Sequence, residues 1–395
     1  MRIELPRYAE RFGAVLFHDL QKVYELDGGM LVDEAFSNPF HVIQQIPLER
    51  LHEIEKDLVI VIPVRNERLR LLEGILSGIP HACLPLIISN SQTMPIDRFR
   101  MERQAVDTFC RYAKKNYVMA HQQSPELAGL FQSAGYHALL NEEGLIRNGK
   151  AEGMIAGLLL ARLLGKKYIG FVDADNYFPG AVFEYVRIFT AGLSQSSSRY
   201  SMVRIQWHSK PKISGNGLFF AKWGRVSRIT NSFLNRFISQ YTGFETDVIK
   251  TGNAGEHALS MDLALQLEYS AGFSVETNHF VNMFEQYGGI HGNGAAVEAM
   301  QAGVNLYQIE SRNPHLHDGK EDGHLEEMIE SSLSVLYHTP LCPELLRHEI
   351  LEELQRLNIL KNGQEPALPH RYPALAGIDF DKVVKQFDLE KHSNF

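Results

Sequence analysis

Short apolar runs alternate with amphipathic stretches through the first half of the chain. Leu58–Val64 reads LVIVIPV, an uninterrupted apolar run that predicts a strand buried on both faces. Similar runs predict further strands over 84–88, 117–120 and 167–172. Helical spacing of apolar residues predicts helices over 68–76, 103–115, 125–134 and 150–164. This alternation predicts an α/β fold with a mostly parallel, Rossmann-like sheet and helices on both faces.

The pattern is less regular on either side of this half. Residues 1–50 predict a β extension of short strands, including 14–17 and 22–26. After a helix over 181–190, we expect a β-like run over 201–207, a basic loop over 210–217, and short helices with glycine-rich turns over 224–300. From 325 to 360, leucines recur at helical spacing opposite glutamates, which fits helices used for internal packing or for a dimer.

Composition narrows the classes of protein. A net charge of −8 argues against general nucleic-acid binding, which needs a basic face. Cys83, Cys110 and Cys342 form no C-x-x-C pair, so neither a disulfide framework nor a cysteine zinc site is indicated. No apolar run approaches the roughly 18 residues that cross a membrane. We therefore expect a cytoplasmic protein with no membrane association.

Two aspartates directly follow the predicted strand over 167–172. Ligands of parallel sheets bind beyond the carboxyl ends of the strands, where both Asp173 and Asp175 can reach them. Carboxylates suit Mg²⁺, or alternatively Mn²⁺, Co²⁺ or Zn²⁺, and such an ion can bridge a diphosphate. Asp-x-Asp also arises by chance, so the prediction of a divalent-cation site depends on the position of this motif directly after a strand.

Two other segments could serve the same site. Lys150 follows Gly149 at the start of a long predicted helix, where backbone N–H groups and the helix dipole favour phosphate, although a solvent-facing lysine is the alternative. His315 and His317 could complete the shell of Mn²⁺, Zn²⁺ or Co²⁺, or both could be solvated loop residues.

The ends of the first two predicted strands are candidate nucleotide contacts. Pro63, Arg65 and Glu67 close the first strand, where the backbone can meet a base and Glu67 can accept from ribose hydroxyls. Alternatively, Asn66 and Glu67 could simply start the next helix. Ser89 and Asn90 end the second strand and are candidate base contacts.

A basic segment in this acidic chain is the candidate site for an anionic acceptor. Lysines 210, 212 and 222 precede Gly224-Arg225-Val226-Ser227. Arg225 can bind phosphate or carboxylate bidentately and Ser227 adds a hydroxyl, unless the segment is only a solvated basic face. Asn253 lies in a glycine-rich segment that fits a sugar pocket or a plain turn.

Taken together, these segments resemble the mannosyl-3-phosphoglycerate synthase family, retaining glycosyltransferases of the GT-A architecture. The resemblance runs through VIPVRNE (61–67), SNS (89–91), IRNGKAEGM (146–154), GFVDADNYFPGAV (170–182), KWGRVSRITN (222–231), TGNAGEHA (251–258) and NPHLH (313–317). It implies divalent-metal-dependent transfer of mannose from GDP-mannose to 3-phosphoglycerate. The product would be the phosphorylated precursor of mannosylglycerate, a compatible solute.

A more distant resemblance, to glucosyl-3-phosphoglycerate synthases, implies individual roles. It implies metal ligands at Asp173, Asp175 and His315. It also implies phosphoglycerate contacts at Gly224, Arg225 and Ser227, and a donor-sugar contact at Glu276 within Gly272–Glu276. The arginine that precedes the metal histidine in that family has no counterpart in register, and Arg312 lies one residue further away.

On this interpretation the chain divides into a β extension (1–50), a nucleotide-sugar-binding half (51–200), an acceptor-binding region (201–320) and a helical tail (321–395). One alternative is another enzyme of the same architecture, such as a glucosyl-3-phosphoglycerate synthase or a sugar nucleotidyltransferase. The other is a non-catalytic nucleotide-sugar sensor, against which the intact Asp-x-Asp and Arg225 argue. Base specificity and a homodimer stay open.

Overall fold

A single twelve-stranded sheet organises the computed structural model, which describes residues 1–26, 42–176, 178–214, 217–221, 224–290, 297–315 and 322–386. Its order is β5-β1-β4-β15-β10-β13-β9-β6-β7-β8, with β3 also paired to β15 and β2 to β3. The strands are β1 (Arg2–Glu4), β2 (Ala9–Phe12), β3 (Val15–His18), β4 (Gln21–Glu25), β5 (Ile43–Gln45), β6 (Leu58–Val64), β7 (Leu84–Ser89), β8 (Val118–His121), β9 (Tyr168–Phe171), β10 (Tyr200–Gln206), β13 (His257–Ser260) and β15 (Val304–Glu310).

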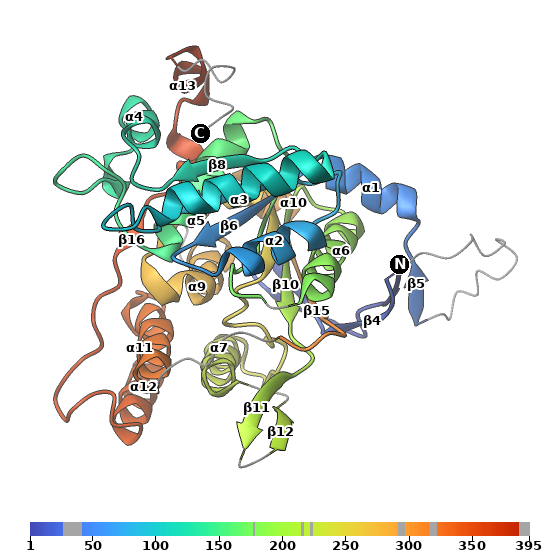
Figure 1. Ribbon diagram of the computed structural model, residues 1–395. Helices are drawn as coiled ribbons and strands as arrows, with labels where there is room; N and C mark the ends of the chain where they lie inside the picture. The colour runs from blue at the N-terminus through green and yellow to red at the C-terminus, as the bar shows by residue number, and fades with distance from the viewer. Residues whose placement is uncertain are drawn as a thin grey trace, which may run out of the picture.

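The helices lie on both faces of this sheet (Figure 1). They are α1 (Leu48–Lys56), α2 (Leu69–Gly78), α3 (Arg98–Ala113), α4 (Pro125–Ser133), α5 (Lys150–Leu163), α6 (Pro179–Gln195), α7 (Arg225–Thr242), α8 (Met261–Gln266), α9 (Val275–Tyr287), α10 (Val297–Ala302), α11 (Asp322–His338), α12 (Glu344–Arg356) and α13 (Phe380–Gln386). Short 3₁₀ turns are η2 (His137–Leu139), η3 (Gly272–Ser274) and η4 (Leu375–Gly377), and β14 (Tyr269–Ser270) pairs with β16 (Arg371–Tyr372) outside the main sheet.

The predicted α/β arrangement is confirmed. Strands β9, β6, β7 and β8 run parallel, and β10 runs parallel to β15, with antiparallel β13 between the two sets. Along β6, Val59 and Val61 join the core beside α5, whereas Ile60 and Ile62 join the core beside α2 and α6. The uninterrupted apolar run is therefore a strand covered on both faces, as its pattern predicts.

Close approach of helix and sheet depends on one glycine. A Cβ at Gly157 of α5 would lie 2.6 Å from Cγ1 of Val61 on β6, well inside a normal contact distance. Glycine at this position lets α5 lie directly on the sheet. This close contact fixes the helix whose first residue is Lys150.

The structure departs from the predicted elements outside the parallel half. Residues 1–26 do form short strands, but these extend the main sheet through β4 and β3, which pair with β15. The loop expected over 210–217 is a hairpin of β11 (Lys210–Ser214) and β12 (Gly217–Ala221). Among the expected short helices, α7 is long because Phe233, Leu234, Phe237 and Ile238 bury a continuous apolar stripe.

The two expected tail helices, α11 and α12, pack within the chain. Helix α11 lies against α7, α9 and η3, and α12 lies against α11 and α7. Their buried leucines include Leu333, Leu336, Leu346 and Leu354. The leucine spacing is thus accounted for by internal packing.

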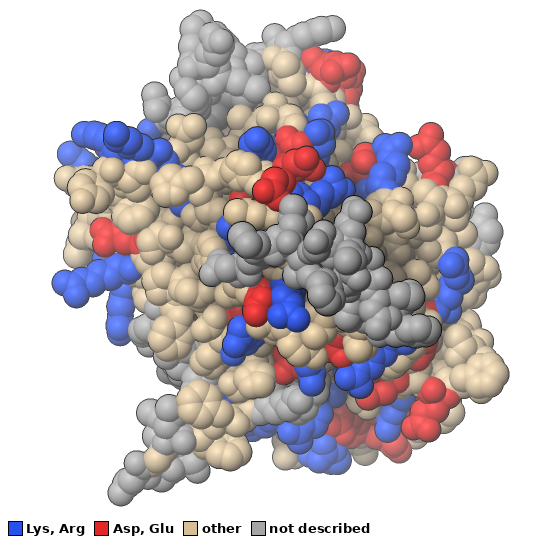
Figure 2. Space-filling model, turned by 90° about the vertical axis from the view of Figure 1, so that its right-hand side faces the viewer, with Lys and Arg blue, Asp and Glu red and all other residues tan. Residues whose placement is uncertain are grey.

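The surface carries charges of both signs. On the face shown in Figure 2, described lysines and arginines lie interspersed with aspartates and glutamates. Within the described ranges, none of the helices combines the length and apolarity needed to span a bilayer.

Candidate functional site

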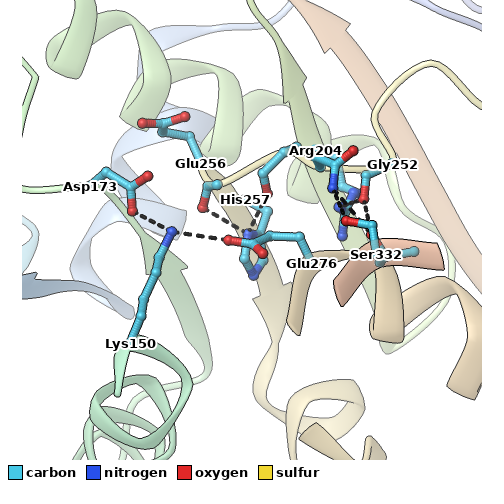
Figure 3. Close-up of polar contacts among 12 residues, drawn as sticks. Lys150, Asp173, Arg204, Gly252, Glu256, His257, Glu276 and Ser332 are labelled. Carbon is cyan, nitrogen blue, oxygen red and sulfur yellow. Dashed lines mark hydrogen bonds and ion pairs between the residues drawn. The ribbon is translucent and has the colours of Figure 1, made fainter. Parts of the chain in front are cut away.

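Three separately predicted residues meet at the carboxyl edge of the sheet. Lys150 opens α5, Asp173 follows β9, and Glu276 lies in the first turn of α9. The Nζ atom of Lys150 is 2.6 Å from Oδ1 of Asp173 and 3.0 Å from Oε1 of Glu276, as Figure 3 shows. Burial by itself would lower the pKa of Lys150, but the two carboxylates raise it well above the usual lysine value. The lysine therefore carries a fixed positive charge at a helix N-terminus, where phosphate binds readily.

The loop before β13 closes over this ion pair. A Cβ added at Gly255 would lie 2.7 Å from Oδ2 of Asp173 and 3.5 Å from Nζ of Lys150. Only a glycine leaves this space beside the carboxylate. The glycine-rich segment is therefore part of the site wall.

Glu256 also belongs to this cluster, although sequence reasoning assigned it no role. Its side chain is completely buried, accepting from Nδ2 of Asn176 at 3.0 Å and from Nε1 of Trp207 at 2.8 Å. The same Asn176 amide donates to the main-chain oxygen of Asp173 at 2.8 Å. Burial, reinforced by the charge of Asp173, raises the pKa of Glu256 to about 7. An acid within the motif at 251–258 was the one signal that could have identified it.

His315 joins the cluster through Trp207. Its imidazole is buried and stacks on the indole, with ring centroids 4.0 Å apart. Its main-chain N–H donates to the oxygen of Ser209 at 2.9 Å, which holds the turn after β15 against the segment after β10. His317 lies outside the described residues.

The chemistry of this edge fits a divalent cation. Across the described part of the chain, no three His, Cys, Asp or Glu side chains come together as a metal-holding group. In this structure the positive charge beside Asp173 is the ammonium of Lys150. The charges of Asp173 and Asp175 nevertheless both help to raise the pKa of Glu256, which bonds to the indole against which the His315 imidazole stacks. Carboxylate oxygens and imidazole nitrogens are ligands that bind Mg²⁺ or Mn²⁺.

A pocket lies beside this cluster, between the end of β10, the start of α7 and the loop at 250–254. Its lining includes Gln206, Trp207, Lys210, Gly224, Ser227 and Asn253. Three of the predicted acceptor-side residues are thus brought together. Gly224 caps α7, so the N–H groups of the first turn, which have no partners within the helix, begin at the pocket. Lys210 lies over the Trp207 ring, with Nζ 3.9 Å from its centroid.

Arg225 is exposed to solvent, whereas Asn253 is buried and fixed by hydrogen bonds. Arg225 is exposed at the first position of α7. Asn253 is buried, and its Nδ2 donates to Oγ of Ser332 at 2.7 Å and to Oγ1 of Thr277 at 3.3 Å. Its Oδ1 is buried at the pocket and has no hydrogen-bond partner. The amide is therefore oriented by α11 and α9 with an acceptor atom still available.

The candidate nucleotide contacts after β6 lie in a stiffened turn. Pro63 and Glu67 are half-buried, and Arg65 is exposed. Between them, Asn66 has a positive φ of 58°, and its N–H donates to Oγ of Ser91 at 2.6 Å. The turn thus departs from both strand and helix geometry, which leaves its polar groups at the sheet edge.

Ser89 occupies a supporting position at the end of β7. Its side chain is fully buried, and its hydroxyl donates to Oε2 of Glu102 at 2.7 Å. The hydroxyl is therefore already engaged with α3. Asn90, the next residue, is half-buried, and its N–H donates to the oxygen of Val64 at 2.7 Å.

Arg312 is not brought to the pocket. Its side chain is exposed and donates from Nη1 to the oxygen of Tyr24 at 2.8 Å, toward β4. Glu184 of α6 holds this turn, accepting from the N–H groups of Arg312 at 2.6 Å and Asn313 at 2.9 Å. These contacts direct the guanidinium away from the predicted substrate side.

A family model and two relatives match nearly the whole chain. Residues 5–387 match the family model of mannosyl-3-phosphoglycerate synthase. The mannosyl-3-phosphoglycerate synthase of Pyrococcus furiosus is 42% identical over 385 residues, covering 98% of this chain and 96% of that protein. That of Aeropyrum pernix is 34% identical over 396 residues, covering 100% and 99%. Glucosyl-3-phosphoglycerate synthase from Mycobacterium tuberculosis, solved with Mn²⁺, UDP-glucose and glycerol 3-phosphate, has a TM-score of 0.49 at 14% identity, covering 85% of this chain and 96% of that one.

Proposed function

The chain belongs to the mannosyl-3-phosphoglycerate synthase family, and from this premise we propose that it transfers mannose from GDP-mannose to 3-phosphoglycerate. The chain is accordingly a glycosyltransferase. The observation that carries the specific proposal is the convergence of Lys150, Asp173 and Glu276 beside a pocket that contains the start of α7. One edge of the sheet thus offers adjacent places for a diphosphate and for a small anion.

The donor diphosphate is assigned to the N-terminus of α5. Lys150 supplies a permanent positive charge there, together with N–H groups of the first turn, which have no partners within the helix. Asp173 and Asp175, with His315, are the residues that would hold a divalent cation, which would neutralise charge on the departing GDP. A cation held at Asp173 would take over the charge compensation that Lys150 now provides, and the ammonium would then be available to contact phosphate oxygens.

The nucleoside is assigned to the turn after β6. Glu67 accepts from ribose hydroxyls, while Pro63, Arg65 and Asn90 border the base. Ser89 supports them from below through Glu102. Glu276 contacts donor-sugar hydroxyls from its position beside Lys150. The preference for guanine over other bases, and a homodimer, are parts of the proposal that rest on the family.

The acceptor phosphate is assigned to the first turn of α7. Gly224 and Ser227 line the pocket, Arg225 lies beside it, and Lys210 adds a further charge. In 3-phosphoglycerate the phosphate is on C3 and the carboxylate on C1, so C2 carries the only alcohol. That hydroxyl attacks the anomeric carbon on the face from which GDP leaves, and its proton passes to the leaving phosphate oxygen. The bond between the anomeric carbon of mannose and the GDP oxygen breaks. A bond between that carbon and the acceptor C2 oxygen forms, and the anomeric configuration is retained.

A direct assay tests the proposal. The enzyme is incubated with GDP-mannose and 3-phosphoglycerate, with and without a chelator, and the product is identified by mass spectrometry and its anomeric configuration by NMR. Chelator-sensitive formation of mannosyl-3-phosphoglycerate is expected. Transfer from UDP-glucose alone would indicate a glucosyltransferase, and pyrophosphate release a nucleotidyltransferase. Nucleotide binding without turnover would indicate a sensor.

A further inference from the structure

Gln206 is the last residue of β10 and lies in the wall of the pocket. Its side chain is only 5% exposed, and both its amide oxygen and its amide nitrogen are buried without a hydrogen-bond partner. Leaving a buried amide unpaired costs free energy, so native proteins rarely do so without a reason. The position of this amide at a pocket suggests that a ligand supplies the missing partners.

The direction of the side chain follows from strand alternation. Residues two apart on a strand project to the same face, so Gln206 shares a face with Arg204. Arg204 donates to the oxygens of Thr251 at 3.0 Å and Gly252 at 3.3 Å. The amide of Gln206 therefore faces the loop at 250–254, which forms the opposite side of the pocket.

A second glutamine shows that this fold can satisfy such a side chain. Gln308 lies on β15, the parallel neighbour of β10, and is also fully buried. Its Oε1 accepts from the N–H of Lys250 at 2.7 Å and from Oγ1 of Thr251 at 2.9 Å. Its Nε2 donates to the oxygens of Val248 at 2.7 Å and His18 at 3.2 Å. Gln308 is a structural residue that holds the loop, whereas Gln206 faces the same loop with its hydrogen-bonding capacity unused.

Charge distribution in the pocket indicates which part of a ligand Gln206 would meet. The first turn of α7 and Lys210 form the positive side, which suits a phosphate. Asn253 offers only its Oδ1, because its amide hydrogens are engaged, so it suits a hydroxyl. Gln206 offers two N–H donors and an oxygen, which suits a carboxylate beside a hydroxyl.

We propose that Gln206 is a specificity-determining contact that binds the carboxylate of the acceptor and thereby selects a phosphorylated hydroxy acid over the corresponding phosphorylated alcohol. The proposal rests on the proposed function and deepens it by assigning the carboxylate end of the acceptor. The amide Nε2 donates to the carboxylate, and Asn253 Oδ1 accepts from the C2 hydroxyl before that proton passes to the leaving phosphate oxygen.

The test compares Gln206→Leu with the wild-type enzyme. Leucine has a similar volume but no hydrogen-bonding group, so KM for 3-phosphoglycerate should rise about tenfold or more, equivalent to about 1.4 kcal/mol. KM for GDP-mannose should change less than about twofold, and inhibition by glycerol 3-phosphate, which lacks the carboxylate, should be unchanged. Calorimetric titration of 3-phosphoglycerate should show the same loss of affinity without turnover.

Unfolding temperatures separate a ligand contact from a structural role. Gln206→Leu should unfold at the same temperature as wild type or higher, because an unpaired amide is removed. Gln308→Leu, the matched control, should unfold at a clearly lower temperature because its hydrogen bonds are lost. Gln206→Met provides a second apolar replacement should the leucine variant fold poorly.

Two results would overturn the inference. If Gln206→Leu and Gln206→Met retain wild-type affinity and preference for 3-phosphoglycerate, the amide is satisfied by something other than the acceptor, while wild-type turnover still supports the proposed function. If both variants lose stability as Gln308→Leu does, Gln206 is structural. Absence of mannosyl transfer by the wild-type enzyme would instead refute the proposed function, and the inference with it.

Discussion

The indole of Trp207 lies flat against the imidazole of His315, with ring centroids 4.0 Å apart and ring planes inclined by 11°. The same indole donates to Glu256 at 2.8 Å and faces the ammonium of Lys210. Trp207 is therefore a shared wall between the carboxylate cluster at the sheet edge and the pocket beside α7. An imidazole oriented by a packed neighbour is better placed to bind a cation than one that must be ordered at the moment of binding.

Replacement of Trp207 tests this orienting role. Trp207→Leu removes the stack and the indole donor, so the affinity for Mn²⁺ in the presence of GDP should fall about 10- to 100-fold. Trp207→Phe keeps a ring against His315 and should lose less. Isothermal titration with Mn²⁺ measures both, and equal affinities in all three proteins would remove the orienting role.

Asp175→Ala tests the assignment of the paired aspartates. Asp175 is proposed to help hold the cation that would neutralise the departing diphosphate. Its loss should therefore lower kcat by about 100-fold or more. Circular dichroism should show a folded protein. The control is Asp262→Ala, which removes a half-buried aspartate paired with exposed Arg199 and should keep normal turnover. Full activity of Asp175→Ala would contradict the assignment.

Lys150→Met tests the phosphate contact. The variant leaves Asp173 and Glu276 without their shared positive charge and removes a charge-assisted hydrogen bond to the donor. KM for GDP-mannose should rise about 10- to 100-fold, and the unfolding temperature should fall. Lys167→Met, which removes an exposed lysine paired with Asp57, should change neither quantity appreciably. An unchanged KM for the donor in Lys150→Met would place the diphosphate elsewhere.

Two buried histidines predict loss of stability in acid. Burial lowers the pKa values of His257 and His279 well below the usual histidine value, and neither nitrogen of His279 has a hydrogen-bond partner. Below about pH 6.5 the unfolded chain takes up protons that the folded chain does not, so the free energy of unfolding falls as pH falls.

His279→Phe should weaken this pH dependence while keeping the ring contacts with His257 and Tyr269. Unfolding temperatures measured from pH 8 to pH 5 should decline less steeply than in wild type. His348→Phe replaces an exposed histidine and should follow the wild-type curve. A His279→Phe curve identical to wild type would show that this histidine does not contribute.

Sequence patterns alone predicted the parallel strands β9, β6, β7 and β8 and the candidate residues at their carboxyl ends, but not β13 and β15, which also lie in the main sheet. Continuous apolar runs identified β6, β7, β8 and β9, because strands covered on both faces are apolar at most successive positions. The rule that ligands bind beyond the carboxyl ends of parallel strands then selected Asp173 and Asp175. The glycine before Lys150 marked the start of α5. These are local features, and each can be read within about a dozen residues.

The tertiary structure decided which polar groups face the site and which support it from behind. Glu256 bonds to Asn176, which is 80 residues away in the sequence, and the burial of Ser89 depends on Glu102 of α3. Contacts with Glu184 and Tyr24 hold Arg312 away from the pocket. Gln206, in contrast, faces the pocket with an unpaired amide. Whether a side chain's hydrogen bonds are satisfied depends on segments that only folding brings together, and local spacing does not encode that.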